Sequence, residues 1–179
     1  MAAIVQQDYP GVTWWCPQLP PSPRQAMQEV IARIASWQNE KGFQSMAVMG
    51  SSLGGFYATW VAEKFGCRAV LLNPAVEPAR DLKRYIGEQT AWHVPEDRFY
   101  FKAEFIDELN VLKVEQLKAA LNYMTIIAKG DEVLDWREMT TRYKGTQIQL
   151  LEGGDHALSD FAEHLPAILD FLKLRTSGV

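Results

Sequence analysis

The most restrictive feature of the chain is a glycine-serine segment, Gly50-Ser51-Ser52-Leu53-Gly54, that directly follows the apolar run 45–49. Residues 53–65 then carry apolar side chains at helical spacing and end at Gly66. A chain that passes from strand to helix over so few residues must bend sharply, which forces Ser52 into a strained backbone conformation. Glycines two residues before and two after the serine leave room for the neighbouring backbone. The segment therefore predicts a strand–turn–helix unit with Ser52 raised above the carboxyl end of the strand.

Short apolar runs alternate with longer stretches at helical spacing along the whole chain. This alternation is typical of βαβ units and predicts a three-layer α/β fold, in which helices cover both faces of a mostly parallel sheet. The length of 179 residues fits one domain, 1–179. The expected strands are 12–16, 45–49, 69–72, 124–128 and 148–151. The expected helices are 23–39, 53–65, 137–143 and 157–174, the last bent or split by Pro166.

Residues 75–120 fit this alternation less well, because they carry charges, prolines and a cluster of aromatic side chains without a clear strand. We interpret them as a helical excursion, or cap region, over one edge of the sheet, where α/β proteins usually shape a ligand pocket. The alternative is that the aromatic residues form core under a long connection. They are Trp92, Phe99, Tyr100, Phe101 and Phe105.

Composition excludes several other classes of protein. The 18 basic and 22 acidic residues give a net charge of −4, without the basic block that a nucleic-acid partner requires. The longest apolar run, Met1–Val5, is far shorter than the ~18 residues that span a bilayer, and it lacks the basic start of a secretory signal. Cys16 and Cys67 lack the spacing of a zinc site or a redox pair, so we expect two buried thiols in a reducing cytoplasm.

A serine hydroxyl becomes a nucleophile when a base takes its proton and an acid holds that base in the correct tautomer. Of the three histidines, His156 follows the predicted strand 148–151, which places it on the same sheet edge as Ser52. His93 lies in the irregular region and His164 within the last helix, so we favour His156 as the base.

The acid is expected between the serine and the histidine in the chain. Asp131 directly follows the predicted strand 124–128 and is favoured, although it could instead cap the next helix. Asp135 is near enough to replace it, and Asp155 is a weak third candidate. Leu53 N–H, at the start of the helix, is the predicted donor to an oxyanion formed at Ser52.

With Ser52, Asp131 and His156 in this order, the chain resembles the α/β-hydrolases and, more narrowly, the YqiA-type esterases, a small bacterial family. The resemblance runs from about Tyr9 to Leu172. It rests on five strings, CPQLP at 16–20, MGSSLGGFYAT at 49–59, LNPAV at 72–76, GDEVLD at 130–135 and EGGDH at 152–156. It implies a cytoplasmic, cofactor-free hydrolase of short acyl esters or acyl thioesters with these three residues as its triad.

The substrate's acyl group would then lie against Phe56, Tyr57 and aromatic side chains of residues 75–120. The alternative for Phe56 and Tyr57 is that both are helix residues facing the core.

The chain departs from this family at its start. Family members begin with a central strand ending in a His-Gly-Phe turn, which supplies a second oxyanion N–H. Here residues 1–11 resemble the tail of the helix that follows that strand, so the first central strand is expected to be missing. We hypothesise that the biological chain has upstream residues, or that a homodimer repairs the sheet by strand exchange. The alternative function is a catalytically silent α/β-hydrolase-like domain that serves as a binding or scaffold protein.

Overall fold

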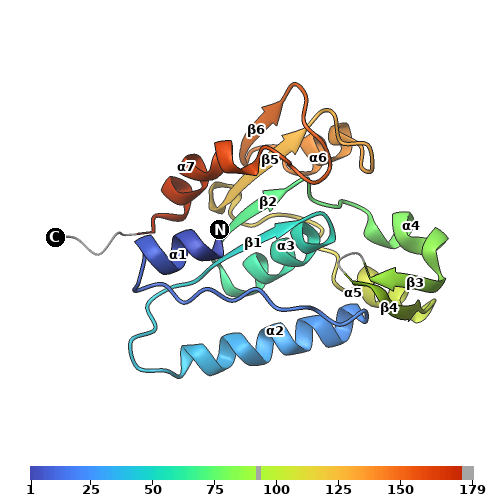
Figure 1. Cartoon of the computed structure of the whole chain (residues 1–179), viewed down its shortest axis with the longest axis horizontal. Helices are drawn as coiled ribbons and strands as arrows, with labels where there is room; N and C mark the ends of the chain where they lie inside the picture. Colours follow the sequence, from blue (N-terminus) through green and yellow to red (C-terminus); the bar gives the residue numbers. More distant parts are fainter. Residues whose placement is uncertain (92–93, 175–179) are drawn as a thin grey trace.

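The computed structural model describes residues 1–91 and 94–174 and is built on a four-stranded parallel sheet (Figure 1). Its strands are β1 (Ala47–Ser51), β2 (Arg68–Leu72), β5 (Tyr123–Ala128) and β6 (Gln147–Leu151), in the order β1-β2-β5-β6. All three pairings are parallel. The strands are short and rich in Val, Ile, Leu and Met because helices cover both faces. The structure confirms the α/β fold and four of the five predicted strands.

Alternate residues of the central strands face the two helical layers. Ala69 and Leu71 of β2 pack with side chains of α3 (Leu53–Phe65) and with Tyr143, which follows α6 (Trp136–Arg142). Val70 and Leu72 pack on the other face, against Ile168 of α7 (Phe161–Leu172). The short helix α1 (Ala2–Asp8) lies beside α7, as Figure 1 shows.

The helix boundaries follow their capping residues. The long helix α2 (Pro23–Gln38) begins after Ser22, whose Oγ accepts the Gln25 N–H at 3.2 Å. Helix α3 ends at Gly66, which has a left-handed φ of +67°. Helix α7 runs through Pro166 without being split. It begins at 161 rather than 157 because the preceding residues form turns, with Leu158 at a φ of +51°.

The predicted strand at 12–16 is wrong. These residues form an irregular connection between α1 and α2 and make no strand pairing. Prolines at 10, 17, 20 and 21 surround them and cannot donate to a sheet. Within the described ranges, nothing pairs with β1 on the side away from β2, so β1 is the edge of the sheet there.

Residues 75–120 are only partly helical, which corrects the predicted helical excursion. They form α4 (Pro78–Leu82), the 3-10 turn η1 (Lys83–Tyr85), an antiparallel hairpin of β3 (Gly87–Ala91) and β4 (Val94–Phe101), and α5 (Glu104–Val111). A second 3-10 turn, η2 (Ala120–Asn122), precedes β5.

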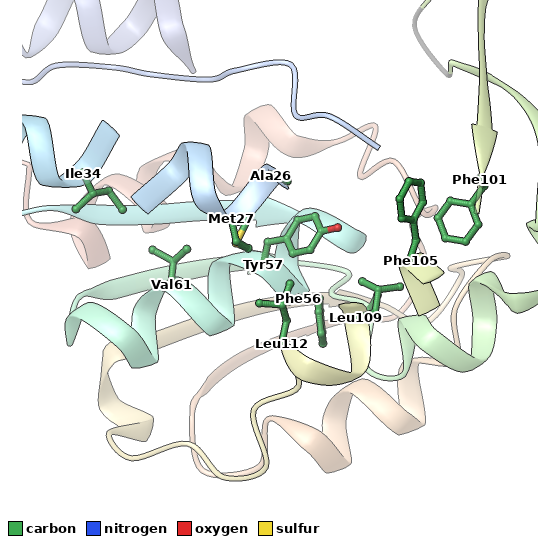
Figure 2. Close-up of a cluster of buried hydrophobic side chains, with 11 residues drawn as sticks. Ala26, Met27, Ile34, Phe56, Tyr57, Val61, Phe101, Phe105, Leu109 and Leu112 are labelled. Atoms are coloured by element: carbon green, nitrogen blue, oxygen red, sulfur yellow. The ribbon is translucent and has the colours of Figure 1, made fainter. Parts of the chain in front are cut away.

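The aromatic side chains of this region divide between core and surface. Phe101 and Phe105 pack edge to face, with ring centroids 5.5 Å apart, in a core cluster shared with α2 and α3 (Figure 2). Tyr100 is exposed, and Trp92 lies outside the described residues. The core alternative is therefore correct for Phe101 and Phe105.

No helix among residues 1–91 and 94–174 combines the length and the apolar character needed to cross a lipid bilayer. Both cysteines are free thiols. Cys67 is buried, as expected, whereas Cys16 is exposed, which corrects the expectation of two buried thiols.

Candidate active site

Ser52 occupies a sharp turn between β1 and α3. Its backbone angles, a φ of +53° and a ψ of −122°, are rarely adopted by residues other than glycine, so the expected backbone strain is present. The carbonyl oxygen of Ser52 accepts the N–H groups of Gly55 (2.9 Å) and Ala75 (3.0 Å), which fix the turn from both sides. The hydroxyl is thereby held at the carboxyl edge of the sheet.

Two glycines, Gly50 and Gly55, make this turn sterically possible, whereas the sequence predicts Gly50 and Gly54. A Cβ at Gly50 would lie 2.0 Å from the Gly54 carbonyl oxygen, and a Cβ at Gly55 would lie 2.7 Å from the Pro74 Cβ. A Cβ at Gly54 would meet no atom within 4 Å. The close approach therefore depends on Gly50 and Gly55. Gly55 was missed because the chain segment that it contacts, at Pro74, is distant in sequence.

A continuous chain of hydrogen bonds joins Ser52, His156 and Asp131. The Ser52 Oγ lies 3.0 Å from His156 Nε2, and His156 Nδ1 lies 2.8 Å from Asp131 Oδ2. The three residues follow β1, β6 and β5 respectively, and the carboxyl ends of parallel strands meet at one sheet edge. With Nδ1–H donating to Asp131, Nε2 is free to accept the hydroxyl proton of Ser52.

The Asp131 carboxylate is completely buried, and both of its oxygens accept hydrogen bonds. Its Oδ1 accepts the N–H groups of Val133 and Leu134, both at 2.8 Å, while Oδ2 accepts from His156. Three hydrogen bonds thus compensate for the removal of this carboxylate from water. The same bonds fix its orientation toward the imidazole.

The two alternative acids make other contacts. Asp135 caps α6, since its Oδ1 accepts the Arg137 N–H at 2.9 Å. Asp155 accepts hydrogen bonds from the hydroxyl and the N–H of Ser159, and the hydroxyl is the larger cause of a pKa below the usual aspartate value. Neither carboxylate has a hydrogen bond to the His156 ring in the described part of the chain.

The other histidines lie elsewhere. His164 is buried in α7, with Nδ1 3.0 Å from Gln149 Nε2. His93 lies outside the described residues.

The loops that carry the acid and the histidine are in close contact with each other. A Cβ at Gly130 would lie 2.2 Å from the Gly154 carbonyl oxygen, so only glycine allows this approach. Glu132 Oε2 accepts the His156 N–H at 3.0 Å. These contacts were missed, and the only sequence signal for them is that Gly130 and Glu132 flank Asp131.

The candidate oxyanion donor lies beside the hydroxyl. Leu53 N–H is the first amide of α3, at the positive end of the helix dipole. Within residues 1–91 and 94–174, it donates to no acceptor and is available to an incoming ligand. Across the same ranges, no cluster of three or more His, Cys, Asp or Glu side chains is arranged to hold a metal ion.

Phe56 and Tyr57 are both core residues. They are 6% and 7% exposed and pack with side chains of α2 and α5, as Figure 2 shows. Burial, reinforced by nearby Glu108, raises the pKa of Tyr57. Phe56 also lines a cavity of about 220 Å³ whose wall includes Ala75 and Val76, whereas Tyr57 does not. Their predicted contact with substrate stays a prediction.

Solved structures of other proteins share this fold. The chain is similar to Est1E from Butyrivibrio proteoclasticus, which was solved with ferulic acid bound (TM-score 0.60, 14% identity, 85% of this chain and 68% of that one). It is also similar to an α/β superfamily hydrolase from Oenococcus oeni (TM-score 0.53, 18% identity, 92% and 80%). These likenesses show that the chain has the α/β-hydrolase fold.

The family follows from the sequence. The model of the Uncharacterised protein family UPF0227, which is the YqiA family, matches residues 1–173, and the chain belongs to this family. A UPF0227 protein of Shewanella sp. strain ANA-3 is 26% identical over 151 residues, which are 83% of this chain and 77% of that protein. The resemblance to YqiA-type proteins is thus confirmed.

Proposed function

We propose that the chain is a serine hydrolase that cleaves short acyl esters or acyl thioesters. The observation that carries the proposal is the hydrogen-bonded chain from Ser52 through His156 to the buried Asp131. Hydrogen bonds of 3.0 and 2.8 Å suit a base that takes the serine proton and an acid that orients the base. The α/β superfamily hydrolase from Oenococcus oeni shares this fold, which adds support by analogy.

The reaction proceeds in two halves. Ser52 Oγ attacks the acyl carbonyl while its proton passes to His156 Nε2, and Leu53 N–H stabilises the oxyanion. The tetrahedral intermediate expels the alcohol or thiol, which takes the proton from Nε2 and leaves an acyl-Ser52 ester. Water then attacks this ester, giving its proton to Nε2, and the carboxylic acid leaves as Ser52 regains a proton. Asp131 orients the imidazole throughout and stabilises its positive charge.

We place the acyl group toward the cavity that Phe56 lines. One of its wall residues, Ala75, lies beside Ser52, because the Ala75 N–H donates to the Ser52 carbonyl. The volume of about 220 Å³ suits a short acyl chain. The free thiols Cys16 and Cys67 support a reaction in the reducing cytoplasm.

One observation favours a second candidate, a binding or scaffold domain without activity. Leu53 N–H is the single oxyanion donor identified in the described ranges, and β1 is the edge of the sheet there. Loss of one oxyanion donor typically lowers the rate by about 10²- to 10³-fold. We therefore expect slow but measurable turnover.

A labelling experiment separates the two candidates. The protein is incubated with a fluorophosphonate probe and, separately, with p-nitrophenyl acetate and butyrate, for the parent chain and for Ser52→Ala and Ser51→Ala. The adjacent and exposed Ser51 is the matched control. We expect labelling and turnover in the parent chain and in Ser51→Ala, and neither in Ser52→Ala. A parent chain that is unlabelled and inactive would support the binding protein instead.

A further inference from the structure

Asn73 is a buried polar residue that the mechanism above does not use. It directly follows β2, next to the turn that carries Ser52, and its exposed fraction is 0%. Its backbone adopts a left-handed φ of +40°, which asparagine tolerates better than most residues. A buried amide in a strained conformation requires compensating contacts.

Those contacts reach both loops of the candidate site. The Asn73 Oδ1 accepts the Ala128 N–H at 2.8 Å, at the end of β5 and three residues before Asp131. The Asn73 Nδ2 donates to the carbonyl oxygens of Asp155 (3.0 Å) and His156 (3.1 Å). The backbone N–H of Asn73 donates to Ile126 O at 2.9 Å. One side chain therefore joins the acid-bearing strand to the backbone of the histidine itself.

The chemistry of an amide is needed for this set of contacts. An aspartate would keep the acceptor for Ala128 but would present an oxygen to two carbonyl groups, which is repulsive. An alanine would leave one N–H and two carbonyls without their partner. The histidine loop is also held by Glu132, by Gly130 and by the ion pair of Lys129 with Glu152, but these residues all lie on the acid loop or at its start. Among the hydrogen bonds of the described residues, those of the Asn73 side chain tie both loops to the end of β2.

We propose that Asn73 is a positioning residue that sets the spacing between the acid loop and the histidine loop. This inference rests on the proposed hydrolase function. The side-chain amide of Asn73 bonds both the Ala128 N–H and the His156 carbonyl. It thereby keeps the His156 ring within hydrogen-bond distance of both Ser52 and Asp131. A displacement of about 1 Å at a reacting group can lower a rate roughly 100-fold.

The test compares Asn73→Asp and Asn73→Ala with a matched control, Thr125→Val. Thr125 is also fully buried and loses one hydrogen bond, 3.3 Å to Thr146 Oγ1, away from the sheet edge that carries the site. We expect both Asn73 variants to lower kcat on p-nitrophenyl butyrate by about 10- to 100-fold with KM changed less than about 2-fold. The fluorophosphonate labelling rate of Ser52 falls in parallel. Thr125→Val lowers only the unfolding midpoint.

A spectroscopic readout makes the inference independent of turnover. An imidazole N–H bonded to a buried carboxylate gives a low-field resonance in a proton NMR spectrum. The resonance of His156 is to be assigned by its disappearance in the His156→Gln variant. We expect this resonance in the parent chain and in Thr125→Val, and its loss or broadening in Asn73→Asp. Asn73→Asp keeps the side-chain size and the Ala128 contact, so it remains informative if Asn73→Ala does not fold.

The two proposals fail in different ways. A resonance and kcat that are unchanged in folded Asn73 variants would overturn the positioning role and leave the hydrolase proposal intact. A parent chain without labelling or turnover would overturn the hydrolase proposal, while the resonance would still decide whether Asn73 positions His156.

Discussion

At the scale of single residues, the turn at Ser52 tolerates an added Cβ at one of its glycines, Gly54, but not at Gly50 or Gly55. Gly50→Ala and Gly55→Ala place a Cβ within 2.0 and 2.7 Å of other atoms, and most of these atoms are backbone. We expect each to lower the free energy of unfolding by at least about 1–3 kcal/mol and to abolish labelling of Ser52. Gly54→Ala enters open space in α3 and should stabilise by up to about 1 kcal/mol. Urea denaturation measures all three, and equal losses at Gly54 and Gly55 would contradict the steric argument.

The identity of the acid is also a single-residue question. Asp131→Asn removes the acceptor that orients the Nδ1–H of His156, and an orienting carboxylate of this kind is worth about 10⁴-fold in kcat. Asp135→Asn keeps a good helix cap at α6 and should change kcat less than about 2-fold. Steady-state kinetics on p-nitrophenyl butyrate distinguish them. The assignment is refuted if Asp135→Asn proves the more damaging variant.

At the scale of elements, Glu108 joins α5 to the first turn of α2. Its Oε2 accepts the Ser22 hydroxyl at 2.7 Å and the Arg24 N–H at 3.1 Å, and the side chain is 8% exposed. Glu108→Ala leaves these donors unpaired and should cost about 1–3 kcal/mol of unfolding free energy. Glu104→Ala, on the same helix, removes only an exposed ion pair with Lys102 and should cost less than about 1 kcal/mol. Urea denaturation of both variants checks this, and similar losses would show that Glu108 does not tie the two helices.

The elements that could be predicted are those whose signal is local. Strand β5 is a continuous apolar run between turn residues, and α3 has both a periodic face and a terminal glycine. The segment 12–16 has strand-forming residues, but a strand also needs a partner, and none is present in the described ranges. Strand β3 carries a single apolar residue, so its pairing with β4 has no local signal.

The same distinction applies to the site. Ser52, Asp131 and His156 each follow an apolar strand, and parallel strands bring such positions to one edge, so their proximity could be predicted. Gly55 and Asn73 could not be predicted in this way, because they contact segments that are distant in sequence. Their roles depend on which loops meet, and a single sequence does not specify that.

At the scale of the whole molecule, the sheet and its helices bury three tyrosine hydroxyls and one cysteine thiol, which are weak acids, in their neutral form. Burial raises the pKa of Tyr57, Tyr123 and Tyr143 above 10.0, with Glu63 adding to the effect at Tyr123, and raises the pKa of Cys67 from 9.0 to about 11. In the unfolded chain these groups lose their protons at the ordinary values. The folded chain keeps these protons up to a higher pH. From about pH 9 up to the folded pKa values, the unfolded chain therefore binds fewer protons than the folded chain.

Stability should consequently be lost at alkaline pH. The contribution of each buried acid is fully present below its unfolded pKa, and it declines as pH rises toward the folded pKa by up to about 1.4 kcal/mol per pH unit. Urea denaturation from pH 8 to 11 should give a constant free energy of unfolding up to about pH 9 and a steepening fall above it. Tyr123→Phe should remove the contribution of one buried acid to the slope of the free energy of unfolding above pH 10. Tyr100→Phe, at a residue 58% exposed, is the control and should leave this slope unchanged. A flat profile to pH 11, or equal slopes in the two variants, would show that the buried hydroxyls do not control alkaline unfolding.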